Sequence, residues 1–467
     1  MTVSPPGSPP QLFTPIEAMR APVSLGSTRP LAWRLEQLDR LGALLSRHRP
    51  AVLEALAADL GKPPLEASFE LVAVQQELKL TRRRLRRWMA PRRVPVDLPL
   101  KPGRAFEQAE PLGCVLIIGP WNYPVQLCLH PLVSALAAGN SVVLKPSEHA
   151  PRTAALIAAA IAEAFPPTSV QVVCGDGDAA ARLLEERFDH IFFTGGGRVG
   201  RLVMAAAARH LTPVTLELGG KSPAIVLADA DLTVTARRLA WGKSINAGQT
   251  CIAPDHVLVE APLREGLVAA LAAELSRFHG AAPLQSEDLA SIVNQAQYDR
   301  LAGLLAGARE RGQVLHGGRC DPQRRRIEPT LLAVESADDP LMREEIFGPL
   351  LPIASVANLE EALSQVRMRP KPLALYLFSH SRQAQRHTLE TTSSGGVCFN
   401  DVVMQAGASA LGFGGVGDSG MGRYHGEAGF LTFSHLRSVL RRPFWLDLPL
   451  RYPPYAGKLQ LVQRLLG

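Results

Sequence analysis

A glutamate and a cysteine lie in two short segments of the chain that glycine and proline residues delimit. Glu217 lies two residues before a glycine pair, Gly219 and Gly220. Cys251 is bracketed by Gly248 and Pro254, which predicts a loop position for the thiol. A thiolate can add to a carbonyl carbon, and a carboxylate can activate the water that hydrolyses the resulting thioester. A lone cysteine is more often a small buried hydrophobe, so spacing alone does not decide for catalysis.

A glycine-rich turn precedes this pair. The segment FTGGGRVGR (193–201) contains G-x-G-x-x-G, with Gly195 and Gly200 at its ends. Such a turn between a strand and a helix lets backbone N–H groups approach a pyrophosphate. The usual dinucleotide rule would then assign Glu217 to the ribose. A catalytic role is the alternative, because Cys251 follows Glu217 in the chain, and spacing alone does not decide between the two roles.

Short apolar runs alternate with helical segments from residue 114 onward, after about ninety residues with helical periodicity. This alternation predicts βαβ units and a parallel sheet covered on both faces, which is a doubly wound, Rossmann-like α/β architecture with ligands at the carboxyl ends of its strands. The expected strands are 114–118, 141–145, 170–174, 190–194, 212–218 and 222–227. The expected helices are 125–139, 153–165, 178–187 and 199–209.

The composition limits the class of protein. A chain of 467 residues is too long for one hydrophobic core and predicts two or three domains. The six cysteines form no C-x-x-C pair, so we expect neither a metal site nor a disulfide framework, but a reducing, cytoplasmic location. The N-terminal MTVSPPGSPP has no secretory pattern, and no apolar run is long enough to cross a bilayer.

The formal net charge is +7, and arginines are concentrated between residues 82 and 93. Nucleic-acid binding is one interpretation of this cluster, but a solvated helix face near a subunit contact is favoured, so no nucleic-acid partner is expected. The amphipathic end of the chain, KLQLVQRLL (458–466), favours a packed terminal helix. Peripheral contact with a membrane surface is the alternative for this tail.

Six segments together resemble motifs of the aldehyde dehydrogenase superfamily, and they occur in that family's order. They are PWNYP (120–124), KPSE (145–148), LELGGKSP (216–223), GQTCIAP (248–254), EEIFGP (344–349) and FGGVGDSGMGRYHG (413–426). The segments KPLALYLFS (371–379) and RYPPY (451–455) are similar to the class 3 branch, which contains fatty and aromatic aldehyde dehydrogenases.

The resemblance implies a role for each catalytic side chain. Cys251 resembles the nucleophile that adds to the aldehyde and carries the thioester. Asn122 resembles the amide that donates to the developing oxyanion, together with the Cys251 backbone N–H. Glu217 resembles the general base that activates water for thioester hydrolysis.

The resemblance also implies a site for NAD or NADP. Lys145 and Glu148 are similar to residues that hold the adenosine ribose, and Glu148 should repel a 2′-phosphate and favour NAD. Gly195 and Gly200 belong to the phosphate turn. Glu345 and Phe347 resemble the nicotinamide-ribose ligand and the wall beside the ring.

The phosphate turn departs from the family pattern. Gly196 and Gly197 stand where the family usually has Ser or Asn followed by Thr, so a hydroxyl contact to the cofactor is missing. His256 and His425 are tempting as proton shuttles, but we interpret His256 as a core or edge residue of an apolar strand and place neither in the catalytic set.

The family resemblance implies a nucleotide-binding domain formed by residues 1–87 and 109–218, and a catalytic domain formed by residues 219–415. Residues 88–108 and 427–446 are expected to form a small β bridging or oligomerisation element, followed by a tail at 447–467. The class 3 relatives are homodimers, so we expect a homodimer. The expected substrate is a medium- or long-chain aliphatic or an aromatic aldehyde, with Leu127 and Met404 lining an apolar tunnel.

Three alternatives differ in chemistry. A CoA-acylating aldehyde dehydrogenase would pass the acyl group to coenzyme A, but such enzymes often lack the glutamate found here at Glu217. A cysteine hydrolase would need a histidine base beside Cys251 and would leave the glycine turn unexplained. A catalytically idle binding protein of the same fold would not need the nucleophile, base and oxyanion donor together.

Overall fold

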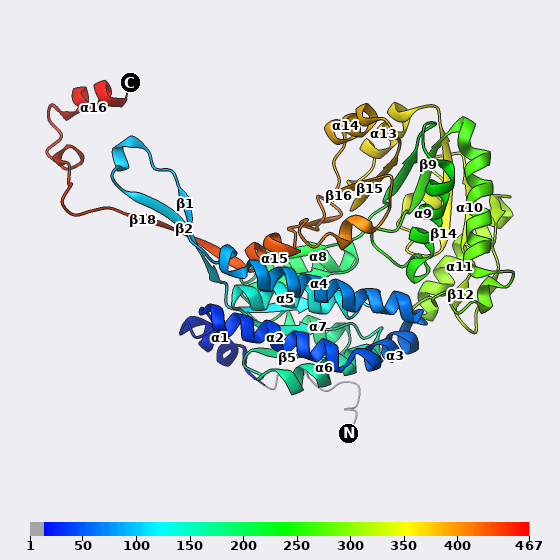
Figure 1. Cartoon of the computed structure of the whole chain (residues 1–467), viewed down its shortest axis with the longest axis horizontal. Coiled ribbons are helices and arrows are strands. Elements are labelled where there is room, and N and C mark those ends of the chain that lie inside the picture. The colour runs from blue at the N-terminus through cyan, green and yellow to red at the C-terminus, as the bar shows by residue number, and fades with distance from the viewer. Residues whose placement is uncertain (1–13, 467) are drawn as a thin grey trace. The chain divides into compact units, whose positions relative to one another are not determined.

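Two largely parallel sheets and one small sheet carry the fold of the computed structural model, which describes residues 14–466 (Figure 1). The N-terminal stretch that the secretory-signal expectation concerns lies outside the described residues. The described chain forms two compact units. The larger unit comprises the residues up to Trp88 together with Glu110–His435, and the smaller one comprises Met89–Ala109 and the residues from Leu436 onward.

The first sheet of the larger unit has six strands in the order β17-β7-β6-β3-β4-β5, and all neighbours except β17 and β7 are parallel. Its strands are buried apolar runs, as a parallel sheet covered on both faces requires. The chain adds β4 and β5 on one side of β3 and then β6 and β7 on the other, which makes β3 and β6 a topological switch point. The strands are β3 (Cys114–Ile118), β4 (Ser141–Lys145), β5 (Val170–Val172), β6 (His190–Thr194), β7 (Val214–Glu217) and β17 (Gly420–Met421).

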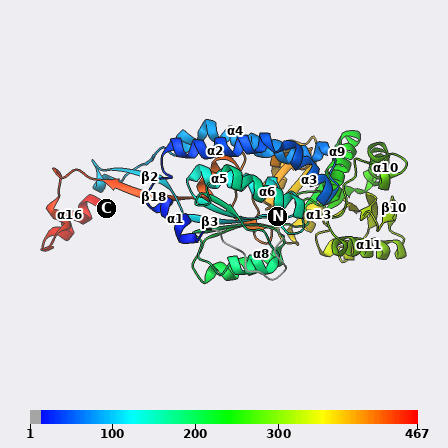
Figure 2. The ribbon, with the colours of Figure 1, turned by 90° about the horizontal axis from the view of Figure 1, so that it is seen from below.

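Helices cover both faces of this sheet. Figure 2 shows α5 and α6 on one side of the strands and α8 on the other. Of the N-terminal helices, α2, α3 and α4 pack against α5 or α6, whereas α1 contacts β3 and β4. The helical periodicity of the first ninety residues is therefore confirmed. The helices of this part are α1 (Ile16–Ser24), α2 (Leu31–Arg47), α3 (Arg49–Leu60), α4 (Pro64–Trp88), α5 (Gln126–Ala138), α6 (Pro151–Ala164), α7 (Gly177–Leu183) and α8 (Gly197–Ala208).

The second sheet of the larger unit has seven strands in the order β10-β13-β14-β9-β8-β15-β16, parallel except for β10. The expected strand at 222–227 begins this sheet and does not extend the first one. Alternate residues of β8 enter hydrophobic clusters on opposite faces of the sheet. The strands are β8 (Pro223–Val226), β9 (His256–Glu260), β10 (Val314–His316), β13 (Thr330–Val334), β14 (Leu350–Val356), β15 (Ala374–Phe378) and β16 (Gly396–Phe399). The helices are α9 (Leu232–Ser244), α10 (Arg264–His279), α11 (Gln295–Glu310), α12 (Pro340–Arg343), α13 (Leu359–Arg367) and α14 (Arg382–Thr391), and a β-pair is formed by β11 (Cys320–Asp321) and β12 (Arg326–Ile327). The short helix α15 (Gly426–Thr432) packs against α4 and α5 of the first sheet.

A three-stranded sheet in the order β1-β2-β18 supplies the regular structure of the smaller unit, together with a terminal helix. Its first two strands are antiparallel. The elements are β1 (Arg92–Val94), β2 (Arg104–Pro111), β18 (Ser434–Arg441) and α16 (Lys458–Leu466). The terminal helix agrees with the amphipathic pattern of the tail, although its Leu459 is exposed.

Two expectations from the composition were a solvated arginine-rich helix face and the lack of an apolar run that crosses a bilayer. Five arginines near the end of α4 are exposed, and Arg82 pairs with Asp39 at 2.8 Å, which is the geometry of a solvated helix face. Between residues 14 and 466, the structure contains no helix that is both long and apolar enough to span a membrane.

Candidate active site

The carboxyl edge of the six-stranded sheet holds the residues predicted from the first half of the chain. Glu217 ends β7 opposite Thr194 of β6, and Lys145 ends β4. Asn122 lies in the loop after β3, and Gly195 lies in the turn after β6. Because the carboxyl ends of parallel strands meet at one edge, four segments distant in sequence converge there.

The amino edge of the seven-stranded sheet supplies the rest of the site. Cys251 lies in the loop before β9, and Glu345 and Phe347 lie in the loop before β14. A Cβ atom at Gly219, two residues after Glu217, would clash with the Glu345 carboxylate. The missing side chain at Gly219 therefore lets the Glu345 carboxylate approach the main chain closely. The site is therefore built where the carboxyl edge of one sheet meets the amino edge of the other.

The nucleophile loop is shaped by backbone conformation. Residues 246–248 have positive φ angles of 51°, 51° and 73° and turn the chain from α9 toward the thiol. A Cβ at Gly248 would clash with the Gly348 carbonyl oxygen, so both the conformation and the space require glycine there. On the other side of the thiol, the Tyr376 hydroxyl donates to the Ile252 carbonyl at 2.5 Å. The cysteine is thus held from both flanks.

Electrostatics keep the thiol of Cys251 protonated in the resting protein. The residue is partly exposed, but burial of the sulfur and the nearby Glu345 and Glu217 carboxylates raise the pKa of the thiol to about 12. Burial also raises the pKa of Glu217 well above its usual range. Within the described residues, neither Glu217 carboxylate oxygen has a hydrogen-bond partner. A buried carboxyl group with a raised pKa and no partner, beside a thiol, makes this place a candidate functional site.

Asn122 is anchored to the main chain next to the nucleophile. Its side chain is buried, and its Nδ2 donates to the Gln249 carbonyl oxygen at 3.1 Å. The preceding Trp121 packs edge-on against Phe347, with ring centroids 5.4 Å apart and planes at 82°. The loop after β3 therefore contacts both loops of the seven-stranded sheet that carry predicted site residues.

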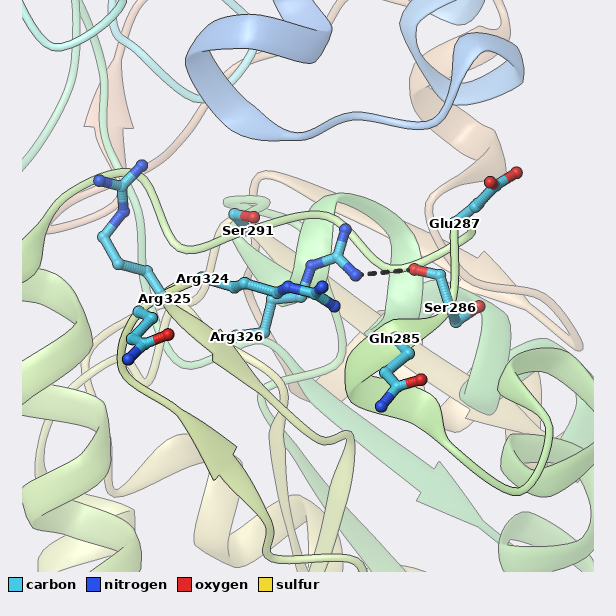
Figure 3. A pocket seen from close by; sticks show the side chains of 8 residues that line it. Gln285, Ser286, Glu287, Ser291, Arg324, Arg325 and Arg326 are labelled. Atoms are coloured by element: carbon cyan, nitrogen blue, oxygen red, sulfur yellow. Dashed lines mark hydrogen bonds between the residues drawn. The ribbon is translucent and has the colours of Figure 1, made fainter.

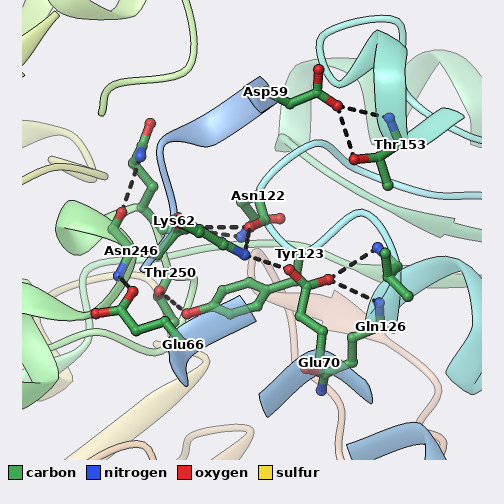
Figure 4. Close-up of polar contacts among 12 residues, drawn as sticks. Asp59, Lys62, Glu66, Glu70, Asn122, Tyr123, Gln126, Thr153, Asn246 and Thr250 are labelled. Carbon is green, nitrogen blue, oxygen red and sulfur yellow. Dashed lines mark hydrogen bonds and ion pairs between the residues drawn. The ribbon is translucent and has the colours of Figure 1, made fainter. Parts of the chain in front are cut away.

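Three charged residues that were not predicted from the sequence complete this region (Figure 4). Lys62, which precedes α4, donates from Nζ to the Asn122 carbonyl oxygen at 2.8 Å and pairs with Glu70. The Glu66 carboxylate accepts from the Asn246 N–H at 2.8 Å. Lys62, Glu66 and Glu70 are spaced four residues apart, which places them on one face of a helical turn. This spacing is the sequence pattern that could have indicated that they act together.

The predicted cofactor residues lie along the same edge of the six-stranded sheet. Lys145 is buried and donates to Glu148 Oε2 at 2.8 Å. Burial opposes ionisation of Glu148, but the bond from Lys145 prevails and lowers its pKa, so the carboxylate is charged at neutral pH. β6 and β3 separate this pair from Glu217 on β7. The structure therefore groups Cys251 with Glu217 and leaves Lys145 and Glu148 farther along the edge.

The glycine turn is open toward solvent at its centre. A Cβ at Gly200 would lie 2.9 Å from Leu218 Cδ2, so this glycine lets α8 pack on the sheet. Gly195 donates its N–H to the Glu217 carbonyl at 3.0 Å. A Cβ at Gly196 would meet nothing within 4 Å, and no side chain caps the start of α8. The first N–H groups of α8 are therefore open to an anion.

The remaining residues singled out from the sequence lie in different surroundings. His256 and His425 are buried, and burial lowers the pKa of each to about 3, so both are neutral. Leu127 is buried in α5, whereas Met404 is 54% exposed.

A cavity of about 440 Å³ lies behind the nucleophile loop (Figure 3). It is lined by polar residues and three arginines, and Arg326 donates to the Ser286 carbonyl at 2.9 Å. None of the predicted site residues lines it. Its wall residue Ser291 accepts from Gln249 Nε2 at 3.0 Å, so the cavity borders the support of the loop and not the thiol itself.

Comparison with known proteins identifies the family. The aldehyde dehydrogenase family profile matches residues 13–439. Aldehyde dehydrogenase family 3 member B1 of Homo sapiens is 48% identical over 446 residues, which cover 95% of this chain and 94% of the relative. The substrate-bound structure of AldH from Staphylococcus aureus superposes with a TM-score of 0.93 at 40% identity and covers 98% of this chain and 99% of its own.

Two more distant structures contain nicotinamide cofactors. The glyceraldehyde-3-phosphate dehydrogenase GapN of Methanocaldococcus jannaschii, complexed with NADP, has a TM-score of 0.81 at 26% identity and covers 91% of this chain and 93% of its own. The indole-3-acetaldehyde dehydrogenase AldA of P. syringae, in complex with NAD+, has a TM-score of 0.84 at 26% identity. The match covers 92% of this chain and 88% of the AldA chain. The chain therefore belongs to the aldehyde dehydrogenase family and is an oxidoreductase that acts on aldehydes.

Proposed function

We propose that this enzyme oxidises an aldehyde to a carboxylic acid through a thioester on Cys251, with Glu217 as the general base and Asn122 as an oxyanion donor. The observation that carries the proposal is the grouping of a thiol, a buried carboxyl group without a hydrogen-bond partner among residues 14–466, and an amide anchored on the nucleophile loop. Nucleophile, base and oxyanion donor are the parts that acyl transfer requires.

The side chains act in sequence. The Cys251 thiol gives its proton to solvent water as its sulfur adds to the carbonyl carbon. Asn122 Nδ2 and the Cys251 backbone N–H then donate hydrogen bonds to the negatively charged oxygen. After oxidation the carbonyl re-forms as a thioester. Glu217 then takes a proton from water, the hydroxide adds to the thioester carbon, and Cys251 leaves with the acid as product. Removing one oxyanion donor typically costs about 2.7–4 kcal/mol in the transition state.

The residues of the six-stranded sheet fit a nicotinamide dinucleotide. The uncapped start of α8 and the empty space at Gly196 can receive the pyrophosphate, and the Lys145–Glu148 pair offers a donor and an acceptor to a ribose. Glu345 and Phe347 would hold the nicotinamide ribose and ring. When bound, the nicotinamide accepts the hydride that the aldehyde carbon releases.

NAD is proposed as the preferred cofactor, because the Glu148 carboxylate is ionised and would repel a 2′-phosphate. Changing Glu148→Gln is expected to raise the kcat/KM ratio of NADP to NAD roughly tenfold, the equivalent of about 1.4 kcal/mol. Steady-state kinetics with both cofactors measure this ratio. Glu163→Gln, an exposed glutamate on α6, is the matched control and should leave the ratio unchanged. An unaltered ratio in the Glu148 variant would remove the electrostatic argument.

The proposed substrates are medium- or long-chain aliphatic or aromatic aldehydes. The support is the similarity to family 3 relatives and the apolar segment of α5, which follows the Asn122 loop. The test is NAD(P)H formation with aldehydes of increasing chain length and with aromatic aldehydes. We expect kcat/KM to rise with chain length. A preference for two-carbon aldehydes would contradict the substrate class, and no reduction with any aldehyde would contradict the proposed function.

The domain roles follow the same proposal. Residues 1–87 and 109–218 would form the nucleotide-binding domain and residues 219–415 the catalytic domain. Residues 88–108 and 427–446 would form the bridging element of a homodimer. Support for an interface comes from the smaller unit, where Phe444 and Trp445 are 104% and 77% exposed. The six free thiols agree with a reducing, cytoplasmic location.

A further inference from the structure

The main-chain carbonyl of Asn122 is held from two directions. It accepts from Lys62 Nζ at 2.8 Å and from Asn246 Nδ2 at 2.9 Å (Figure 4). The Asn246 amide also donates to the Gln249 carbonyl at 3.1 Å, which is the same oxygen that the Asn122 side chain contacts. The orientation of the Asn122 peptide, and with it that of its side chain, is therefore fixed by residues outside its own loop.

Lys62 and Glu70 form a fully buried ion pair behind this peptide. Both side chains are 0% exposed, and Lys62 Nζ lies 2.5 Å from Glu70 Oε1. The other Glu70 oxygen accepts from the N–H groups of Val125 and Gln126, each at 3.0 Å, where α5 begins. Burying two charges carries a large desolvation cost, so such a pair adds little net stability compared with apolar residues of similar volume. A role in fixing geometry accounts better for its presence.

The same lysine also links the Asn122 loop to the nucleophile loop. Its ammonium group lies 4.0 Å from the centre of the Tyr123 ring. The Tyr123 hydroxyl is 2.7 Å from Thr250 Oγ1, and Thr250 is the residue before Cys251. One buried charge thus contacts the supports of both the oxyanion donor and the thiol.

We propose that the Lys62–Glu70 pair is a positioning device that fixes the Asn122 peptide so that the Asn122 amide meets the carbonyl oxygen of an aldehyde at Cys251. The inference rests on the proposed function, in which Asn122 is the oxyanion donor. Neither Lys62 nor Glu70 touches the substrate, so both act through Asn122. A displacement of about 1 Å in a catalytic group is enough to lower a rate roughly 100-fold.

The decisive variant is Lys62→Met together with Glu70→Gln, which leaves no unpaired buried charge and keeps an acceptor for Val125 and Gln126. We expect kcat/KM for the aldehyde to fall about 10- to 100-fold, while the Kd of NAD, measured by calorimetry, stays unchanged. In an Asn122→Ala background the same pair of changes should lower the rate less than about twofold, because the residue through which the pair acts is already gone.

Asp59→Asn is the matched structural control. The Asp59 carboxylate on α3 accepts from the Thr153 N–H and hydroxyl, both at 2.8 Å, at the start of α6, as Glu70 does at the start of α5. Asp59 does not contact Asn122, so Asp59→Asn should keep the wild-type kcat/KM. Its melting temperature should be similar to that of the variant with Lys62→Met and Glu70→Gln. If the variant with Lys62→Met and Glu70→Gln does not fold, Lys62→Gln with Glu70→Gln retains a polar pair and enters the same cycle.

Two results would overturn the inference. One is a pair variant with wild-type kcat/KM, and the other is a triple variant in which the losses multiply, as independent effects do. Failure of the proposed function has a different signature, because oxidation would then survive Cys251→Ala or Asn122→Ala. If only the positioning role fails, both of those variants remain impaired.

Discussion

Replacing Cys251 by alanine is expected to lower aldehyde oxidation roughly 10⁶-fold, the scale of loss seen when a covalent nucleophile is removed. The reason is that the proposed thioester needs this sulfur, and two of the other thiols are enclosed in the core. Cys114 lies inside β3 and Cys128 inside α5, and both are buried with their thiol pKa raised to about 12. The measurement is NAD(P)H formation at saturating aldehyde, both in the steady state and in the first turnover.

Cys398→Ala provides the matched control for this variant. Cys398 on β16 is another partly buried thiol, and it packs against the same hydrophobic cluster as Cys251. Its loss removes a similar volume from the same core, so any general weakening of the fold should appear in both variants. We expect Cys398→Ala to oxidise aldehydes at nearly the wild-type rate. Activity retained in Cys251→Ala would show that the reaction does not proceed through this thiol.

The second large effect is expected from Glu217→Gln, which should lower steady-state turnover about 10²- to 10⁴-fold. The first turnover should persist as a burst of NAD(P)H, because formation of the thioester does not need the base. The Cys251 thiol and its surroundings stay in place in this variant, so the burst should not become slower. Stopped-flow absorbance separates the burst from the steady state.

The pH dependence has a defined sign. A general base works in its deprotonated form, and burial raises the pKa of Glu217 well above its usual range. The fraction of active base in the wild type therefore grows as pH increases, and steady-state turnover should rise with it. In Glu217→Gln this part of the pH profile should disappear.

An added nucleophile distinguishes hydrolysis from earlier steps. Hydroxylamine attacks thioesters without a protein base, so it should restore turnover to the Glu217→Gln enzyme. Loss of the burst together with turnover would place Glu217 before the thioester and contradict its assignment as the hydrolytic base. Formation of acyl-CoA by the wild-type enzyme when coenzyme A is supplied would favour the acylating alternative.

The strands of the nucleotide-binding architecture could be predicted well because their sequences carry a strong signal. Three expected strands, 114–118, 141–145 and 190–194, coincide with the observed β3, β4 and β6. These are continuous apolar runs bounded by glycine or polar residues. The expected strand at 212–218 was too long, since β7 spans Val214–Glu217. The role of 222–227 as the start of a second sheet depends on which strands become neighbours, and local periodicity does not encode that.

The buried charges behind the site could not be found from pattern alone. Lys62, Glu66 and Glu70 lie on or next to a helix rich in charged residues, most of which face solvent. Periodicity places charges on a helix face but does not indicate that a face with lysine and glutamate is buried. Their partners are main-chain groups of Asn122, Val125 and Asn246, which sequence does not display as acceptors or donors. The open centre of the glycine turn, by contrast, follows directly from Gly196 and Gly197.

The high pKa of the Cys251 thiol has a consequence for the durability of the enzyme. Peroxide and other oxidants react with thiolates, and the first product, a sulfenic acid, leads on to irreversible sulfinic and sulfonic acids. Because burial raises its pKa to about 12, the Cys251 thiol stays protonated at pH 7. Burial of the sulfur, aided by the nearby Glu345 and Glu217, therefore protects the nucleophile from oxidative inactivation between turnovers.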